Sequence, residues 1–311
     1  MTFPQHPSVA PATPAAPATP AAPAAGAEAA PTEPPVPCAS PGGPEGSGAE
    51  PSALAARLRA AGCVFAEDEA ALILATARTA REALAMAELR ASGPPLEHVL
   101  GWAGFRGLRI TVTPGVFVPR RRSEFLAAEA VALAARRAPR PPVVVDLCCG
   151  SGAIGAALLA ALPRAELVAA DIDPVAVRCA RLNVVPRGGG VHEGDLFDAL
   201  PAALRGRVDV LVANVPYVPS GEVALLPTEA RDHEPLVSLD GGGDGLGVLR
   251  RVTAGALGWL APGGHLLVET SGRQAERAAR AFRDGGLTTE VATCEEPPAT
   301  VVVGTRPDTG G

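Results

Sequence analysis

The chain has 311 residues and a formal charge of −6, and 47% of its residues are hydrophobic although only 3% are aromatic. This composition supplies a core built mainly from Ala, Val and Leu, and the length suits one large domain or two modest ones. The negative charge argues against binding by neutralisation of many phosphates, and no apolar stretch approaches the roughly 18 residues of a membrane span. Cys and His lack metal-binding spacing, so we expect free thiols in a reducing cytosol and no metal site.

The first 50 residues form a compositional block of their own. Residues 1–50 contain 13 Pro and 14 Ala and no Arg. Proline at this density interrupts helices and sheet ladders, so we expect a disordered, partly polyproline-II tail. The block lacks the basic start and the unbroken apolar core of a secretory signal.

The composition changes after the tail, where Leu and Ala recur among Arg and Glu. This pattern predicts two or three amphipathic helices over residues 52–91, with a break near Gly62 and an end at Gly93-Pro94-Pro95. We therefore expect a helical N-terminal region over residues 51–95.

A linker over residues 96–122 follows the helical region. Residues 104–118 alternate between apolar and polar side chains around Pro114-Gly115, which is typical of a β-hairpin. Ser123 and Glu124 then begin an Ala- and Leu-rich helix that runs to about Arg137.

Arg120, Arg121 and Arg122 form the only basic run of the chain, directly before that helix. We interpret the run as a solvated helix entrance. The alternative is contact with a protein or nucleic-acid substrate.

From Val143 onward, short apolar runs alternate with Ala-rich helical patterns. The runs lie at 143–147, 166–171, 208–213, 264–269 and 299–304. This alternation predicts parallel strands buried on both faces, so we expect a doubly wound α/β sheet over residues 140–307. Ligands of such sheets bind at the carboxyl ends of the strands, so the chemistry should follow each run.

A glycine-rich turn follows the first predicted strand. Residues 146–155 (DLCCGSGAIG) place Gly150, Gly152 and Gly155 in a GxGxxG spacing. These glycines allow a tight turn, and the next helix offers its first N–H groups to a polar or anionic ligand. The spacing fits a nicotinamide-dependent dehydrogenase as well as a nucleoside-binding methyltransferase, and a turn without a ligand is the structural alternative.

Acidic residues follow the second and third strands. Asp171 is placed to accept both hydroxyls of a ribose, whereas Asp173 has the features of a helix N-cap. Asp195, after a poorly marked strand, can accept from the exocyclic amine of adenine with Leu196 against the ring. Alternatively, Asp195 caps the helix that follows it.

The segment Asn214-Val215-Pro216-Tyr217 contains the only Tyr and one of the only two Asn of the chain. The Asn214 side-chain oxygen and the Val215 carbonyl can each accept one hydrogen of an –NH₂ group. Pro216 fixes a backbone angle beside that carbonyl, and Tyr217 offers a flat face to a planar amide or base. The segment therefore predicts that a nitrogen is positioned for methyl transfer, unless it is an ordinary Asn-x-Pro turn.

Together these motifs resemble the HemK/PrmC family of protein-(glutamine-N(5)) methyltransferases, which are class I enzymes that depend on S-adenosylmethionine. The resemblance extends from Leu96 to Val303 and is carried by seven blocks. They are Leu96–Gly101, Phe117–Arg120 with Ser123-Glu124, Asp146–Ile154, Asn214–Tyr217, Glu234-Pro235-Leu236, Leu239–Gly242 and Glu269. The chain has NVPY where the family has NPPY, and Cys148 replaces the first glycine of the family's cofactor loop.

The resemblance implies a Rossmann-like, mostly parallel sheet with an antiparallel last strand, preceded by a small helical part and a linking hairpin. The methyltransferase domain is then expected at residues 123–307, with S-adenosylmethionine as its cofactor. The implied cofactor-binding residues are Asp146, Cys148, Cys149, Gly150, Ser151, Gly152, Asp171, Asp195, Leu196 and Asn214.

The resemblance also assigns a substrate and a partner. Asn214, Val215, Pro216 and Tyr217 are the implied catalytic residues, and they would bind the GGQ glutamine of a peptide chain release factor. The helical region at 51–95 would dock that protein. An adenine-N6 methyltransferase of DNA or RNA is the main alternative, and a nicotinamide-dependent oxidoreductase and a non-catalytic binder are two others.

Overall fold

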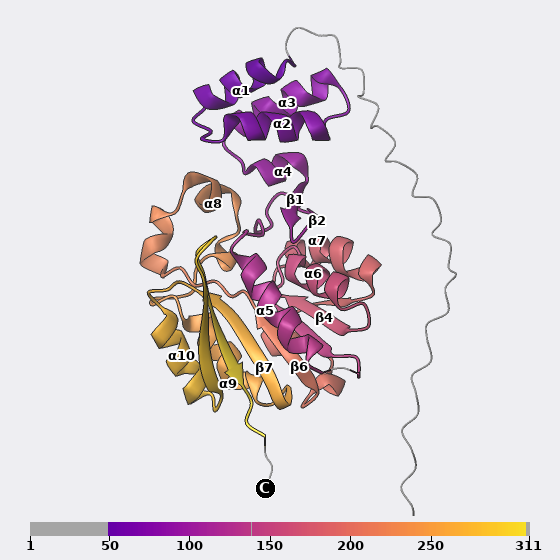
Figure 1. Cartoon of the computed structure of the whole chain (residues 1–311). Coiled ribbons are helices and arrows are strands. Elements are labelled where there is room, and N and C mark those ends of the chain that lie inside the picture. The colour runs from indigo at the N-terminus through magenta and orange to yellow at the C-terminus, as the bar shows by residue number, and fades with distance from the viewer. Residues whose placement is uncertain (1–48, 138, 309–311) are drawn as a thin grey trace, which may run out of the picture. The chain divides into compact units, whose positions relative to one another are not determined.

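The computed structural model of the protein describes residues 49–137 and 139–308. The predicted tail at 1–50 therefore lies outside the described residues, except for its last two positions. Three helices follow, α1 (Pro51–Ala60), α2 (Ala66–Thr76) and α3 (Ala80–Ala91), as the sequence predicts (Figure 1). They pack on a small core of their own that includes Leu54, Leu58 and Ile73.

The linker forms a short helix, α4 (Leu96–Leu100), and a hairpin of two strands, β1 (Trp102–Phe105) and β2 (Leu108–Thr111). The hairpin is confirmed, but the predicted place of its turn is wrong. The chain reverses at Arg106 and Gly107, which have φ angles of 47° and 74°, and not at Pro114-Gly115. Two successive residues with positive φ match the twist of a two-residue hairpin, whereas Pro114-Gly115 forms a separate turn after β2.

A seven-stranded sheet forms the rest of the fold, in the order β5-β4-β3-β6-β7-β9-β8. All neighbouring strands pair in parallel except that β9 is antiparallel to both β7 and β8, which confirms the antiparallel last strand. The strands are β3 (Val143–Leu147), β4 (Glu166–Asp171), β5 (Gly190–Glu193), β6 (Val208–Ala213), β7 (Leu260–Thr270), β8 (Thr288–Cys294) and β9 (Ala299–Thr305).

Strand β8 has no counterpart among the predicted apolar runs. It is the edge strand beyond β9, and its residues are exposed or half-buried, so no continuous apolar run marks it. Strand β7 also begins four residues before the predicted run at 264–269, because Pro262 and Gly263 interrupt the apolar pattern while the strand continues.

Helices cover both faces of the sheet (Figure 1). The described helices α5 (Ser123–Ala135), α6 (Ala153–Ala161) and α7 (Pro174–Val184) share a core with Val144 and Val210, whereas α9 (Gly247–Ala256) and α10 (Ala275–Asp284) share one with Val145 and Leu211. Successive strand residues point to opposite faces, so these two cores form on either side of one sheet. Among the described residues, no helix combines the length and apolarity needed to cross a membrane.

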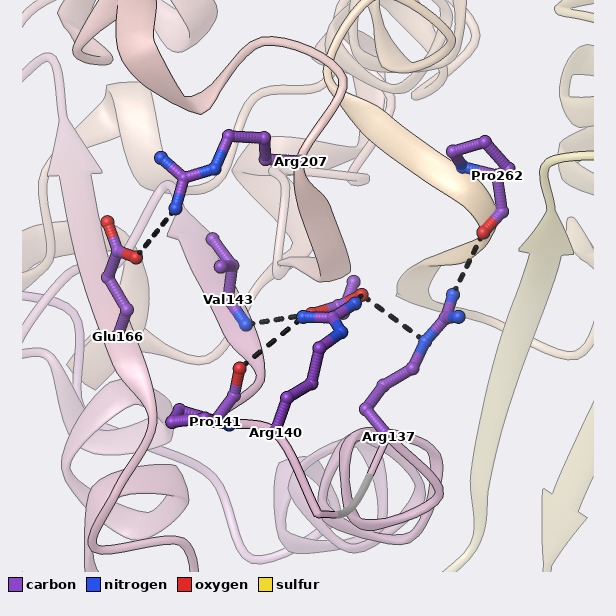
Figure 2. Close-up of polar contacts among 8 residues, drawn as sticks. Arg137, Arg140, Pro141, Val143, Glu166, Arg207 and Pro262 are labelled. Atoms are coloured by element: carbon purple, nitrogen blue, oxygen red, sulfur yellow. Dashed lines mark hydrogen bonds and ion pairs between the residues drawn. The ribbon is translucent and has the colours of Figure 1, made fainter.

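A buried carboxylate fastens α5 to the sheet, at the end opposite the carboxyl ends of the parallel strands. Asp209, the second residue of β6, is completely buried and accepts hydrogen bonds from Arg140 and from the Val143 backbone N–H at 2.9 Å. Arg137 lies 3.2 Å from the same carboxylate, and Figure 2 shows Arg137 and Arg140 in this region together with Val143. A buried charge is tolerated only when it is paired and hydrogen-bonded in this way.

Candidate active site

A cavity of about 400 Å³ opens at the carboxyl ends of the parallel strands, a volume in the range of ligand sites. Its wall brings together three predicted segments, namely the loop after β3, the end of β4 and the segment after β6. The linker, helix α8 (Thr228–His233), the stretch that follows α8 and the first turns of further helices contribute to the rest of the wall. The predicted site residues on the wall are Cys148, Cys149, Gly150, Ser151, Asp171, Asn214, Val215, Pro216 and Tyr217.

The loop after β3 adopts a conformation that favours glycine. Cys148, Gly150 and Gly152 have φ angles of 54°, 54° and 75°. An ideal Cβ on Gly150 would meet no described atom within 4 Å, whereas one on Gly152 would lie 2.8 Å from a methyl carbon of Val184. Gly150 therefore leaves open space beside the cavity for a ligand, and Gly152 allows the loop to pack on α7. This open cradle fits the cofactor that the sequence implies.

Asp171 ends β4 beside that loop. Its Oδ2 accepts from the Gly150 backbone N–H at 2.8 Å, and its Oδ1 accepts from the Asp173 N–H at 2.9 Å. Burial raises the pKa of Asp171, and the two N–H groups oppose that shift by stabilising the carboxylate. Each oxygen keeps a further lone pair, so the carboxylate can still accept from ligand hydroxyls. Asp173 caps α7 by accepting from Val175 N–H at 2.8 Å, which confirms its predicted structural role.

Asp146 lies behind the loop and does not line the cavity. It is completely buried, and its Oδ2 accepts from the Gly155 N–H at 2.8 Å. Its Oδ1 has no hydrogen-bond partner among the described residues. Burial, the largest cause, raises the pKa of Asp146 to about 7. The Asp146 side chain is buried and is not part of the cavity wall. Its direct contact with a cofactor therefore stays a prediction.

Asp195 and Leu196 do not line the cavity either. Asp195 accepts from Arg251 Nη2 at 2.7 Å, so an adenine amine at this carboxylate would share it with a guanidinium. The alternative prediction that Asp195 caps the next helix is wrong for its side chain, which makes no capping bond within the described chain. Leu196 is buried with a φ of 49°.

All four residues of the segment after β6 line the cavity. Asn214 Nδ2 donates to the Ser123 hydroxyl at 3.4 Å, which leaves the Asn214 side-chain oxygen to act as an acceptor. The Val215 side chain is only 2% exposed and packs in the core beside α9. The core therefore accommodates Val at this position, while Pro216 and Tyr217 line the cavity.

The backbone of the glycine-rich stretch 241–245 packs directly against the segment after β6. Gly241 and Gly245 are buried behind the segment after β6, and Gly241 N–H donates to the Val218 carbonyl at 2.8 Å. A Cβ on Gly241 would lie 2.7 Å from the Pro216 carbonyl oxygen, and one on Gly245 would collide with the Tyr217 carbonyl. These glycines are needed because backbone packs directly against backbone here.

The basic run is only partly the solvated helix entrance that the sequence predicts, because two of its three members pair with buried carboxylates. Arg120 Nη2 lies 2.6 Å from both carboxylate oxygens of Glu234, whose side chain is completely buried. Arg122 Nε donates to buried Glu269 at 2.9 Å while 41% of the Arg122 side chain stays exposed, and Arg121 is exposed as well. Burial raises the pKa of Glu234, although Arg120 opposes this shift by stabilising the carboxylate.

Sequence reasoning missed the second asparagine. Asn183 in α7 accepts from the Thr111 N–H at 2.9 Å, and its Nδ2 donates to the carbonyls of Thr111 and Ser151 at 2.8 Å each. It thereby ties the hairpin to the cofactor loop. Its rarity in the chain, which pointed to Asn214, was also the available signal for Asn183.

Comparisons with known proteins find several methyltransferases among the proteins that this chain resembles. Residues 107–230 match the methyltransferase small domain family. The release factor glutamine methyltransferase of Mycolicibacterium smegmatis is 41% identical over 204 residues, which cover 65% of this chain and 70% of that protein. The 4-amino-L-phenylalanine/4-methylamino-L-phenylalanine methyltransferase of Streptomyces pristinaespiralis is 37% identical, over 63% of this chain and 68% of that protein.

Among solved structures, the hMettl16 catalytic domain in complex with an RNA hairpin superposes with a TM-score of 0.51. It is 15% identical and covers 75% of this chain and 83% of that one. A likeness at this level of identity supports the fold of the sheet and its helices and does not extend to the substrate.

Proposed function

This chain belongs to the family of release factor glutamine methyltransferases, and from that premise we propose that it methylates the side-chain amide nitrogen of a protein glutamine. S-adenosylmethionine is the methyl donor in this proposal, and the GGQ glutamine of a peptide chain release factor is the substrate. One observation carries it, namely that Asn214 and the open cradle at Gly150 line the same cavity.

One set of cavity residues would hold the methyl donor, and another set would hold the glutamine that accepts the methyl group. The loop at Cys148–Gly152 and the carboxylate of Asp171 would hold S-adenosylmethionine, which supplies an electrophilic methyl group on a positively charged sulfur. The Asn214 side-chain oxygen and the Val215 carbonyl would accept the two hydrogens of the glutamine amide. These acceptors fix the nitrogen, so the rate gain comes mainly from proximity and orientation.

No catalytic base has to remove a proton before the reaction. The amide nitrogen becomes acidic once it carries the new methyl group, and it then loses one proton to the surroundings. In this proposal the residues of the cavity bind and orient the amide, and Tyr217 supplies the flat face on which it lies.

We also propose a division of the chain and a location. The helices over residues 51–95 would dock the release factor, because they form a separate small core next to the catalytic part. The five cysteines within the described range are free thiols, which supports a reducing compartment such as the cytosol.

The decisive experiment incubates the protein with labelled S-adenosylmethionine and one substrate at a time. We expect label in a release factor with an intact GGQ and none when its glutamine is replaced by glutamate. Transfer to 4-amino-L-phenylalanine instead would assign a small amine as the substrate, and transfer to DNA or RNA would assign the adenine activity. Calorimetry with NADH separates the oxidoreductase alternative, since we expect heat of binding only with the methyl donor.

A further inference from the structure

Arg122 contacts residues from two other segments of the chain and has no part in the proposed reaction as described so far. Its Nε donates to Glu269 Oε1 at 2.9 Å, and its Nη2 donates to the Tyr217 hydroxyl. The guanidinium carbon lies 5.9 Å from the centre of the Tyr217 ring. Arg122 directly precedes α5, Tyr217 follows β6, and Glu269 lies near the end of β7, so the linker and two neighbouring strands meet at one side chain.

Glu269 is a buried carboxylate that pairs with Arg122. Its side chain is 2% exposed, and Arg122 is the ion-pair partner that the described residues provide. In the pairing of β6 with β7, Ala213 lies opposite Val268, which places Glu269 level with Asn214. A buried carboxylate needs such a partner, so Glu269 holds the guanidinium beside the substrate segment.

The start of α5 therefore holds both ends of the substrate segment. Ser123 accepts from Asn214, and Arg122 donates to Tyr217. The phenol hydroxyl lies on the long axis of the ring, so its hydrogen bond to Arg122 fixes where that axis points and therefore where the ring lies. The planar guanidinium can contact a carboxylate and a phenol at once, which the single ammonium of Lys does less well.

We infer that Arg122 is a positioning residue, held by Glu269, that fixes the Tyr217 ring at the wall of the substrate cavity. This inference rests on the proposed function and adds the residue that holds the Tyr217 ring in place at the cavity wall. Arg122 acts through Tyr217 in this account and does not itself bind the glutamine.

Kinetics of a double-mutant cycle test this role. Arg122→Lys and Tyr217→Phe should each lower kcat for the release factor by roughly 10- to 100-fold, the scale expected for small misplacement of a substrate. The double variant should be no slower than the slower single variant, because the two residues act through one contact. If the fold-loss of kcat in the double variant equals the product of the two single losses, the inference is overturned, since Arg122 would then act independently of the Tyr217 hydroxyl.

A matched control and a binding measurement exclude a general structural effect. Arg121→Lys, an identical change at the exposed neighbour, should leave kcat unchanged. Calorimetry should give the same affinity for S-adenosylmethionine in the wild type and in Arg122→Lys. An equal loss of kcat in Arg121→Lys, or a weakened donor affinity in Arg122→Lys, would contradict a role confined to Tyr217.

The contact itself is measurable without any activity, because Tyr217 is the only tyrosine. Burial raises the pKa of the Tyr217 phenol, while the Arg122 charge lowers it and the Glu269 charge raises it. An ultraviolet titration should therefore give a higher phenol pKa in Arg122→Met and an unchanged one in Arg121→Met. If Arg122→Met does not fold, Arg122→Gln removes the same charge with a polar side chain and should raise the phenol pKa likewise.

The two measurements separate the inference from the proposed function. If the wild type methylates the release factor but the Tyr217 pKa does not change when the Arg122 charge is removed, the role of Arg122 is overturned. The predicted phenol shifts in a protein that methylates no release factor would support the contact and overturn the proposed substrate.

Discussion

Arg90 in α3 pairs with Glu229 in α8 at 2.6 Å, and it also donates to Glu69 in α2 at 2.7 Å. Glu229 lines the cavity, so one guanidinium joins the helical N-terminal region to the wall of the candidate active site. The Arg90 side chain is 8% exposed, and the pair with Glu69 is correspondingly shielded from water.

We expect Arg90→Met to lower the free energy of unfolding by about 3–5 kcal/mol, because it leaves the shielded Glu69 carboxylate without its partner. The control is Arg57→Met in α1, whose pair with Glu88 is about half exposed and should contribute about 0–1 kcal/mol. Urea unfolding of both variants gives the comparison. An equal loss of unfolding free energy in Arg90→Met and Arg57→Met would mean that the Arg90 pairs contribute no more to stability than an exposed ion pair does.

The Asn214 acceptor should be essential for methyl transfer and dispensable for folding. We expect Asn214→Ala to reduce kcat by roughly 100-fold, since the amide loses one of its two positioning contacts. The partner residue provides a graded control, because Ser123→Ala removes only a 3.4 Å hydrogen bond and should cost less. Transfer at the wild-type rate in Asn214→Ala would remove this residue from the substrate site.

The backbone packing behind the substrate segment gives a prediction that needs no side-chain chemistry. A Cβ at Gly241 would lie 2.7 Å from the Pro216 carbonyl oxygen, whereas one at Gly243 would meet no described atom within 4 Å. We therefore expect Gly241→Ala to lower kcat at least roughly tenfold by displacing Pro216, and Gly243→Ala to behave as wild type. Transfer of labelled methyl groups and thermal unfolding of both variants test this. Equal transfer rates in Gly241→Ala and Gly243→Ala would show that the substrate segment tolerates a displacement of Pro216.

The buried carboxyl of Asp146 should make stability depend on pH. Burial raises its folded-state pKa from 3.8 to about 7, so the folded protein keeps a proton that the unfolded chain releases. The resulting stabilisation is full below about pH 4 and is lost as the pH rises to about 7, on the order of 4 kcal/mol in total.

Asp146→Asn cannot ionise, so its free energy of unfolding should fall less than that of wild type between pH 4 and about 7. Urea unfolding at a series of pH values measures the difference. Asp284→Asn, at an exposed position of α10, should retain the wild-type slope. A wild-type slope in Asp146→Asn as well would show that this carboxyl is ionised throughout.

Local patterns were enough to predict the strands that carry the site and the loops that follow them. The apolar runs that became β3, β4 and β6 lie in the interior of the sheet, where burial on both faces demands continuous apolar side chains. The polar residues after them therefore met at one edge, as the parallel topology requires. Edge strand β8 lacks this demand, so its sequence gave no comparable signal.

Contacts between distant residues could not be predicted from spacing. Arg120 and Glu234 are 114 residues apart, and Arg122 and Glu269 are 147 residues apart, so nothing in the local composition reveals that a basic run meets buried carboxylates. The packing of Gly241 on Pro216 was missed for the same reason, because a run of glycines looks alike whether water or backbone lies against it.

The buried carboxylates of Asp209, Glu234 and Glu269 are all paired with arginine, in a chain that contains no lysine. A guanidinium stays protonated beyond about pH 12, so these pairs should survive alkaline buffers in which an ammonium begins to discharge. Acylating enzymes and amine-directed reagents likewise find no side-chain amine to neutralise. The contacts that hold the cleft and the opposite end of the sheet are thus closed to lysine modification as a means of control.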